Sequence, residues 1–162
     1  MREILFRGKR TDNGKWIYGN YCYAELIDKS GYEDLIIEQP ADGETRRVIP
    51  KTVGQYTGLK DKNGKRIFEG DIVYCKSRLD NANMVVIFEC GQFRMVLSEN
   101  YRSYQTNSGF YDINCFDKEV IGNIHDNPEL LKGEWENDSS WIKKYTWKIS
   151  QGWRNRYTLF RR

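Results

Sequence analysis

Two glycine–lysine pairs are the first candidates for chemistry in this chain, because a glycine-rich loop that ends in lysine can cradle phosphate groups. Gly58 is separated from Gly64-Lys65 by five residues, whereas a phosphate-binding loop of this type has four. Arg66 then stands where that loop needs a Ser or Thr for magnesium. An earlier copy, Gly8 to Gly14-Lys15, has the same spacing. The spacing argues against nucleotide binding, and turn chemistry explains these residues better.

A second candidate is His125, the only histidine, which precedes Asp126. A carboxylate that orients an imidazole is a general-base arrangement. On extended backbone, however, neighbouring side chains point to opposite faces, and no nucleophile motif accompanies the pair. Asp71, which follows Gly70, is expected to accept backbone donors in the turn that begins a strand. We therefore assign no catalytic residue and expect a protein that is not an enzyme.

The cysteines do not predict a metal or redox site. No two of them are closer than 15 residues, so the chain has no pair with the spacing typical of zinc or dithiol chemistry. We expect reduced thiols that pack as small apolar side chains, and neither a metal nor a cofactor. The four are Cys22, Cys75, Cys90 and Cys115.

Residues 132–162 are the strongest candidate for binding. They hold eight Lys or Arg against three acids, a net charge of +5, while the other 131 residues carry −2. Four of the five tryptophans lie in the same segment. The candidate partner-binding residues are Trp141, Lys143, Lys144, Tyr145, Trp147, Lys148, Trp153, Arg154, Arg156, Tyr157, Arg161 and Arg162.

Three interpretations of this segment stay open. Cations that neutralise phosphates beside rings that stack on bases are typical of single-stranded nucleic-acid grooves. Trp, Tyr and Arg also dominate protein hot spots. The third interpretation is a terminal hairpin that packs its aromatic rings onto the body of the protein. The six-residue spacing of Trp147 and Trp153 favours a β-hairpin over a helix.

The elements before this segment are read from a local repeat. Shifted by fifty residues, Asn13-Gly14-Lys15 falls on Asn63-Gly64-Lys65, with an aromatic residue and Gly upstream and an apolar pair downstream. Asn-Gly between β-rich runs predicts a hairpin with a type I′ turn. Asp42-Gly43 predicts another hairpin, and Pro50 ends its second strand. We favour similar hairpins over true structural symmetry as the cause of the repeat.

The overall pattern predicts a mainly β protein. Short β-rich runs punctuated by Gly, Pro and Asn-Gly suggest a sandwich or small barrel. Asn127-Pro128-Glu129 is expected to begin one short helix, with Asn127 as its N-cap. The expected division is an N-terminal β region over 1–68, a barrel region over 69–131 and the basic, Trp-rich extension over 132–162.

The same motifs resemble the YopX family of phage and prophage proteins. The resemblance rests on the opening residues 1–8, the block from Val53 to Val73 that contains Asn-Gly-Lys and Glu-Gly-Asp-Ile-Val, and the ending Val120 to Leu131. It implies a coiled N-terminal sheet region of β-hairpins and an SH3-like barrel that begins near Glu69. It also implies an origin in temperate phages. No catalytic residue comes with this resemblance, and residues 132–162 lie outside it.

These observations favour a non-enzymatic phage accessory protein that binds a host or phage protein, in the manner of an inhibitor of host defence. A nucleic-acid-binding module that uses the basic aromatic tail is the alternative. The N-terminus is charged from residue 2 and no apolar run reaches the roughly 18 residues of a membrane span. We therefore expect the host cytoplasm and no membrane partner. Self-association through Trp147 and Trp153 is a further hypothesis.

Overall fold

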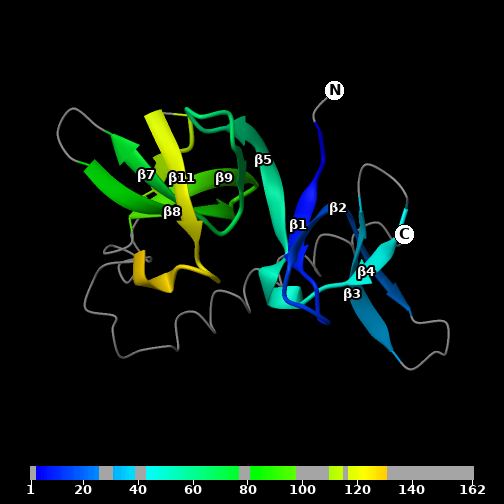
Figure 1. The fold of residues 1–162 in the computed structure, drawn as a ribbon. Helices are drawn as coiled ribbons and strands as arrows, with labels where there is room; N and C mark the ends of the chain where they lie inside the picture. The colour runs from blue at the N-terminus through cyan, green and yellow to red at the C-terminus, as the bar shows by residue number, and fades with distance from the viewer. Residues whose placement is uncertain are drawn as a thin grey trace. The chain divides into compact units, whose positions relative to one another are not determined.

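The computed structural model describes residues 3–25, 31–38, 43–76, 81–97, 110–114 and 117–130 (Figure 1). These residues are mainly β, as the sequence predicts, with strands in two antiparallel sheets and two short 3₁₀ helices. No helix among them is long and apolar enough to cross a bilayer. The hairpin expected within residues 132–162 lies outside the described residues.

The chain divides into two compact units between Gln55 and Tyr56, inside one strand. We call the described part of Ile4–Gln55 the N-terminal unit, and Glu3 together with the described part of 56–130 the C-terminal unit. The boundaries expected at residues 68 and 131 stay predictions.

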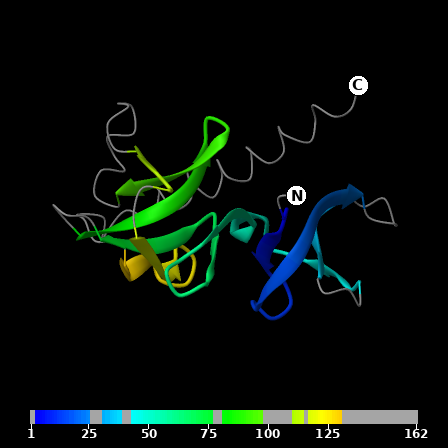
Figure 2. The ribbon, with the colours of Figure 1, turned by 90° about the horizontal axis from the view of Figure 1, so that it is seen from above.

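The N-terminal unit is an antiparallel sheet with the order β4-β3-β2-β1-β5. Its elements are β1 (Phe6–Lys9), β2 (Trp16–Glu25), β3 (Tyr32–Glu38), β4 (Thr45–Arg47), the 3₁₀ helix η1 (Pro50–Thr52) and the start of β5 (Gly54–Lys60). Figure 2 shows β2 as the long blue strand of this unit. Pro50 begins η1 directly after the β4 region, which confirms that it ends the strand.

The predicted hairpins are present, but their turn type is different. Gly14 has φ 68° and Gly64 has φ 81°, while neither Asn13 nor Asn63 has positive φ. A type I′ turn needs positive φ at both central residues, so that prediction is wrong. The Asn13 Oδ1 instead accepts from the Lys15 N–H at 3.0 Å. In the second turn the corresponding acceptor of the Lys65 N–H is Asp61 Oδ1, so neither turn relies on a left-handed asparagine.

The two copies of the repeat also differ in register. Lys9 pairs with Trp16 in the first hairpin. In the second, Lys60 pairs with Arg66, which corresponds to positions 10 and 16 of the first. The shift of one residue agrees with similar hairpins whose turns are built differently.

The core of the N-terminal unit lies on the face of the sheet that carries the odd-numbered residues of β2. It consists of Phe6, Ile17, Ile36, Val48 and Val53, with Tyr21 packed against it. Two glycines let the strands approach closely across this core. A Cβ on Gly8 would lie 3.1 Å from Val48, and one on Gly19 would lie 1.8 Å from the backbone oxygen of Ile37. Only glycine fits at position 19 of this sheet.

The C-terminal unit contains the second antiparallel sheet, with the order β10-β9-β8-β7-β11. Its elements are the remainder of β5, β6 (Arg66–Phe68), β7 (Asp71–Lys76), β8 (Asn81–Glu89), β9 (Gln92–Leu97), β10 (Phe110–Asp112), β11 (Asp117–Asn123) and the 3₁₀ helix η3 (Pro128–Leu130). The helix start predicted at Pro128 is confirmed as this single short turn.

Apolar side chains from every part of this unit form its core. Ile67, Val73, Val86 and Met95 have no solvent exposure. Cys75, Met84, Phe93, Ile113 and Val120 complete the cluster. Among the described strands, β10 and β11 stand at the two ends of the sheet and no ladder joins them. The sheet is therefore open, and the closed barrel that was expected is not found in the described part of the chain.

The close approach at Gly19 makes a prediction about stability. Gly19→Ala forces a methyl group into the Ile37 carbonyl, so β2 and β3 must separate, and we expect a loss of about 3 kcal/mol in the free energy of unfolding. Gly14→Ala is the matched control, because a Cβ there meets nothing within 4 Å and only its φ of 68° is unfavourable. That variant should lose about 1 kcal/mol. Urea denaturation measures both, and equal losses would contradict the assignment.

Candidate functional site

Asp61 accepts three backbone hydrogen bonds within the C-terminal unit. Its Oδ1 accepts from the backbone N–H groups of Asn63 at 2.8 Å and Lys65 at 2.9 Å. Its Oδ2 accepts from the Val120 N–H at 3.0 Å. The residue is only 7% exposed. One buried carboxylate thus closes the β5–β6 turn and ties it to β11, as turn chemistry predicts and metal binding does not require.

The charge of Asp61 is set by these contacts. Burial raises its pKa, but the three backbone donors from Val120, Lys65 and Asn63 outweigh burial, and the pKa lies below the usual 3.8. Beside it, Lys62 pairs with Glu119, and the hydrogen bond from Lys62 lowers the pKa of the Glu119 carboxyl. Asn63 Nδ2 donates to the same carboxylate at 3.1 Å. The side chains of Asp61, Lys62 and Asn63 thus all make contacts that hold the turn against β11.

The Glu-Gly-Asp segment is likewise built into the fold. Asp71 is 1% exposed, and its Oδ2 accepts from the Phe68 N–H at 2.8 Å. This confirms the predicted role of Asp71 in the turn that begins β7. Gly70, with φ 81°, donates its N–H to the carbonyl of Val86 and accepts from the Ile124 N–H. The segment joins three separate stretches of chain.

The expectation that His125 lies on extended backbone is wrong. The residue lies in a turn in which Asn123 Oδ1 accepts from the N–H groups of both His125 and Asp126 at 3.0 Å. The Asp126 carboxylate accepts from Asn123 Nδ2 at 2.9 Å. Asp126 therefore contacts the asparagine that organises the turn, which supports a structural role for this motif.

The same turn depends on Gly122 and Asn127. A Cβ on Gly122 would lie 2.6 Å from Asn127 Oδ1 and 2.8 Å from Leu130 Cδ1. Asn127 Oδ1 accepts from the Asn123 N–H at 3.4 Å, a backward contact in place of the N-cap bond that was expected. Asn83 Nδ2 in β8 donates to the Leu130 carbonyl at 2.9 Å, which anchors η3.

The described thiols are free, and Cys75 is buried as expected, whereas Cys90 is exposed, so the expectation of a packed apolar side chain is wrong there. Cys22 lies in β2, Cys75 in β7 and Cys90 in the β8–β9 turn. Burial raises the pKa of Cys75 to about 11, and its Sγ lies 3.7 Å from Met95 Sδ. A thiol with this pKa is a poor nucleophile near neutral pH. Cys115 lies outside the described residues.

None of the twelve predicted partner-binding residues, Trp141 to Arg162, lies in the described part of the chain. Two aromatic clusters of the N-terminal unit lie in the described part of the chain, and in the first of them Arg7 is buried, at 7% exposed. The first is a cation–π cluster on β1 and β2, where the Arg7 guanidinium lies 4.7 Å and the Lys9 Nζ 5.5 Å from the centre of the Trp16 ring. Tyr18, opposite Arg7 and 43% exposed, continues this face.

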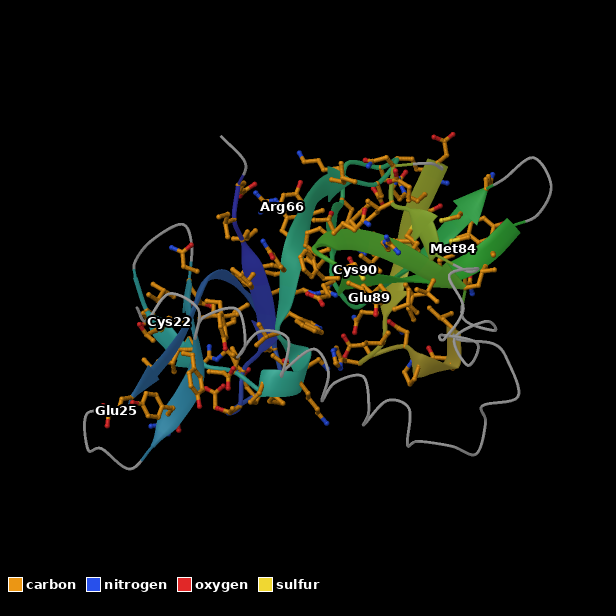
Figure 3. All side chains as sticks on the ribbon, turned by 180° about the vertical axis from the view of Figure 1, so that it is seen from behind. Cys22, Glu25, Arg66, Met84, Glu89 and Cys90 are labelled. Atoms are coloured by element: carbon orange, nitrogen blue, oxygen red, sulfur yellow. The ribbon has the colours of Figure 1, made fainter. Side chains whose placement is uncertain are left out.

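The second feature is a tyrosine–carboxylate patch at the far end of the β2–β3 hairpin. The rings of Tyr23 and Tyr32 are stacked, with centroids 5.4 Å apart and an interplanar angle of 19°. Tyr23 is paired directly with Asp34, and Tyr32 with Glu25. Figure 3 places Glu25 at the end of this hairpin. Local composition gave little sign of the patch, because it exists only once the register of the two strands is known.

Comparison with known proteins adds a family to this geometry. A family model described as "YopX protein" matches residues 5–132. The chain belongs to the YopX family. The match covers the Asp61 turn, the Glu-Gly-Asp segment and the Asn123 turn, so the resemblance stated from the sequence is confirmed. Residues 133–162 follow the YopX region.

Other comparisons add less. No curated protein matches this chain. The chain is similar to protein EF1440 from Enterococcus faecalis, a crystal structure, at 24% sequence identity and a TM-score of 0.47. That match covers 82% of this chain and 100% of the other.

The Asp61 contacts predict a pH-dependent stability. In Asp61→Asn an amide N–H₂ faces the Val120 N–H, so a charged hydrogen bond is lost, and we expect about 2 kcal/mol less unfolding free energy at pH 7. Because the folded pKa is lowered, the carboxylate stabilises the fold above pH 4 and this contribution is lost as pH falls through the folded pKa. The difference between wild type and variant should therefore shrink below about pH 4.

Urea denaturation at pH 7, 5 and 3 measures this difference. Asp117→Asn is the control, since Asp117 lies on the same strand β11 and is exposed. It should change stability by less than about 0.5 kcal/mol at pH 7. A loss in Asp61→Asn that stays constant down to pH 3 would contradict the role of the charge.

Proposed function

We propose that this YopX-family protein works by binding another protein and not by catalysis. The observation that carries the proposal is the concentration of Trp, Tyr, Lys and Arg in residues 132–162. Such residues contribute large, partly apolar contact areas and directional hydrogen bonds at protein interfaces. The tyrosine–carboxylate patch on the N-terminal unit supports the same class of function. The partner-binding residues of the tail are those named above.

The polar chemistry of the described residues agrees with a binding role. Asp61 and Asp71 accept backbone hydrogen bonds, Asp126 bonds to Asn123, and Glu119 is paired with Lys62. In each case the side chain stabilises a turn or an anchoring contact of the C-terminal unit. These contacts explain the polar residues of the family motifs without assigning them a reaction.

The biological setting is part of the proposal. The family resemblance supports a protein encoded by a phage or prophage and active in the host cytoplasm, where an inhibitor of host defence would meet its target. We further propose an SH3-like arrangement for the C-terminal unit. Its order β10-β9-β8-β7-β11 supports this, because the last strand lies beside the first, as in SH3-like folds. Self-association through the tail tryptophans is retained as a secondary hypothesis.

Nucleic-acid binding is the second candidate function. Its specific support is the cation–π pair of Lys9 and Trp16, both half-buried, together with the basic aromatic tail. Rings beside cations are the usual elements of a single-stranded nucleic-acid groove. The residues before the tail carry a net charge of −2, which disfavours a wide duplex-binding face.

A pull-down from host lysate tests the protein-binding proposal. In one full-length variant the five tail aromatic residues of the predicted set become Ser, and in a second its seven Lys and Arg become Gln. We expect a host protein that wild type captures after nuclease treatment and that the aromatic variant loses. Circular dichroism and urea denaturation check that each variant is folded. Full capture by both folded variants would remove the tail from the binding site.

A salt titration decides for or against the second function. If the tail contacts phosphates, affinity for a single-stranded oligonucleotide should fall about linearly in log–log form, with a slope set by the number of phosphates neutralised. The Gln variant should lose both the affinity and the slope. Fluorescence anisotropy at about 50 to 200 mM salt measures this. No binding at 50 mM salt would eliminate nucleic acid as the ligand.

A further inference from the structure

The β2–β3 hairpin extends as a ribbon past the strands that flank it. β1 pairs with β2 only from Trp16 to Gly19, and β4 pairs with β3 only from Leu35 to Ile37. The ladder between β2 and β3 continues to the pair of Glu25 and Tyr32. A two-stranded ribbon of this kind has little stability of its own. Contacts between its side chains must therefore provide the stability that additional strands would give.

Four side chains share one face of this ribbon in a chequered arrangement. Directly opposed residues of an antiparallel pair project from the same face, and so do residues two apart along a strand. Tyr23 opposes Asp34, and Glu25 opposes Tyr32. The tyrosines therefore lie on one diagonal and the carboxylates on the other. Tyr23 is 42% and Tyr32 49% exposed, so the stacked rings remain at the surface.

One carboxylate of the patch, that of Asp34, is held in place by a hydrogen bond from a neighbouring side chain. The Tyr21 hydroxyl donates to Asp34 Oδ1 at 2.6 Å. Tyr21 in turn packs against the Phe6 ring, with centroids 5.5 Å apart, and against the core of the N-terminal unit. Asp34 is thus positioned by a core residue, whereas Glu25 at the end of the strand is exposed to solvent.

Among the described residues, the two arginines of the neighbouring strand β4 are paired with carboxylates. Arg46 forms an ion pair with Glu44, and Arg47 with Glu33. Arg47 opposes Leu35, so it lies on the other face of the sheet from Asp34. Two carboxylates beside two exposed rings give this surface a local negative charge.

We propose that the tyrosine–carboxylate patch is a docking site for a basic segment of another protein. A Lys or Arg side chain lies against the stacked rings through a cation–π contact, and its charge is neutralised by Glu25 and Asp34. Arginine fits best, because its planar guanidinium stacks on a ring and offers several donors to a carboxylate. The two carboxylates repel phosphate groups, which excludes nucleic acid and anionic lipid as the occupant.

A purely structural role for the tyrosines would explain only part of this arrangement. Stacking stabilises the ribbon whatever lies on the other diagonal. The stack itself does not require carboxylates beside it, and the two that are present give the surface charge complementarity to a cation. The site lies outside residues 132–162, so it goes beyond the proposed role of the tail and does not depend on it.

Titration of the ¹⁵N-labelled full-length protein tests the proposal by NMR. The probe is a peptide with blocked termini, Gly-Arg-Gly-Arg-Gly, and the matched control is Gly-Gln-Gly-Gln-Gly. We expect the arginine peptide to shift the amide resonances of residues 23–25 and 32–34, and the glutamine peptide to leave them in place. Equal shifts with both peptides, or shifts spread evenly over the protein, would overturn the proposal.

Variants separate docking from stability. Tyr32→Thr removes the ring from a strand position that threonine favours, and Glu25→Gln removes one charge from an exposed side chain. Each substitution should weaken the affinity for the arginine peptide about two- to fivefold, whereas Tyr32→Phe should retain the affinity. Dispersed amide spectra show that the variants are folded. Unchanged affinity in folded Tyr32→Thr and Glu25→Gln would overturn the docking site.

A second copy of the chain is the competing occupant. Analytical ultracentrifugation of wild type, Tyr32→Thr and Tyr32→Phe tests it. A dimer that is lost in Tyr32→Thr and retained in Tyr32→Phe would assign the patch to self-association. That result would overturn the proposal that the patch binds a different protein. A wild-type monomer that binds the arginine peptide supports the proposal.

Discussion

The C-terminal unit depends on a single buried carboxylate that accepts three backbone hydrogen bonds. Asp61 holds the N–H groups of Asn63 and Lys65 on one oxygen and the N–H of Val120 on the other. Backbone donors in a buried turn must find acceptors, and a charged acceptor forms stronger bonds than a carbonyl. Because these donors come from two distant stretches of chain, the shape of a local turn and the position of β11 are set by the same group.

The Glu-Gly-Asp segment and the Asn123 turn follow the same physical rule. In each, a short polar side chain satisfies nearby backbone donors, and a glycine permits either a positive φ, as at Gly70, or a close contact that a Cβ would prevent. Gly122 illustrates the second half of the rule, since its missing Cβ leaves room for Asn127 and Leu130. The YopX motifs therefore encode how turns are joined to strands. Asp61, Asp71 and Asn123 each make such a structural contact.

Sequence reasoning predicted what local chemistry determines. The hairpins, the end of the strand at Pro50 and the role of Asp71 follow from residues that are neighbours in the chain. The prediction of type I′ turns was wrong. In the first turn Asn13 does not adopt the positive φ that the Asn-Gly pair suggested, and its Oδ1 accepts a hydrogen bond from the Lys15 N–H. The bond from Val120 to Asp61 spans 59 positions, and one sequence carries no sign of it. The tyrosine–carboxylate patch exists only in the register of β2 and β3, which pairs Tyr23 with Asp34 and Glu25 with Tyr32.

The Asp61 turn has one more consequence, which concerns the exposed border of the sheet. β11 is the last strand in the order β10-β9-β8-β7-β11, and such a strand offers a row of unused backbone groups to strands of other molecules. Here the Lys118 carbonyl accepts from the Lys62 N–H, and the Val120 N–H is bonded to Asp61. The turn thus caps part of the border that could template aggregation. The motif that shapes the fold therefore also occupies backbone groups on the outer edge of β11.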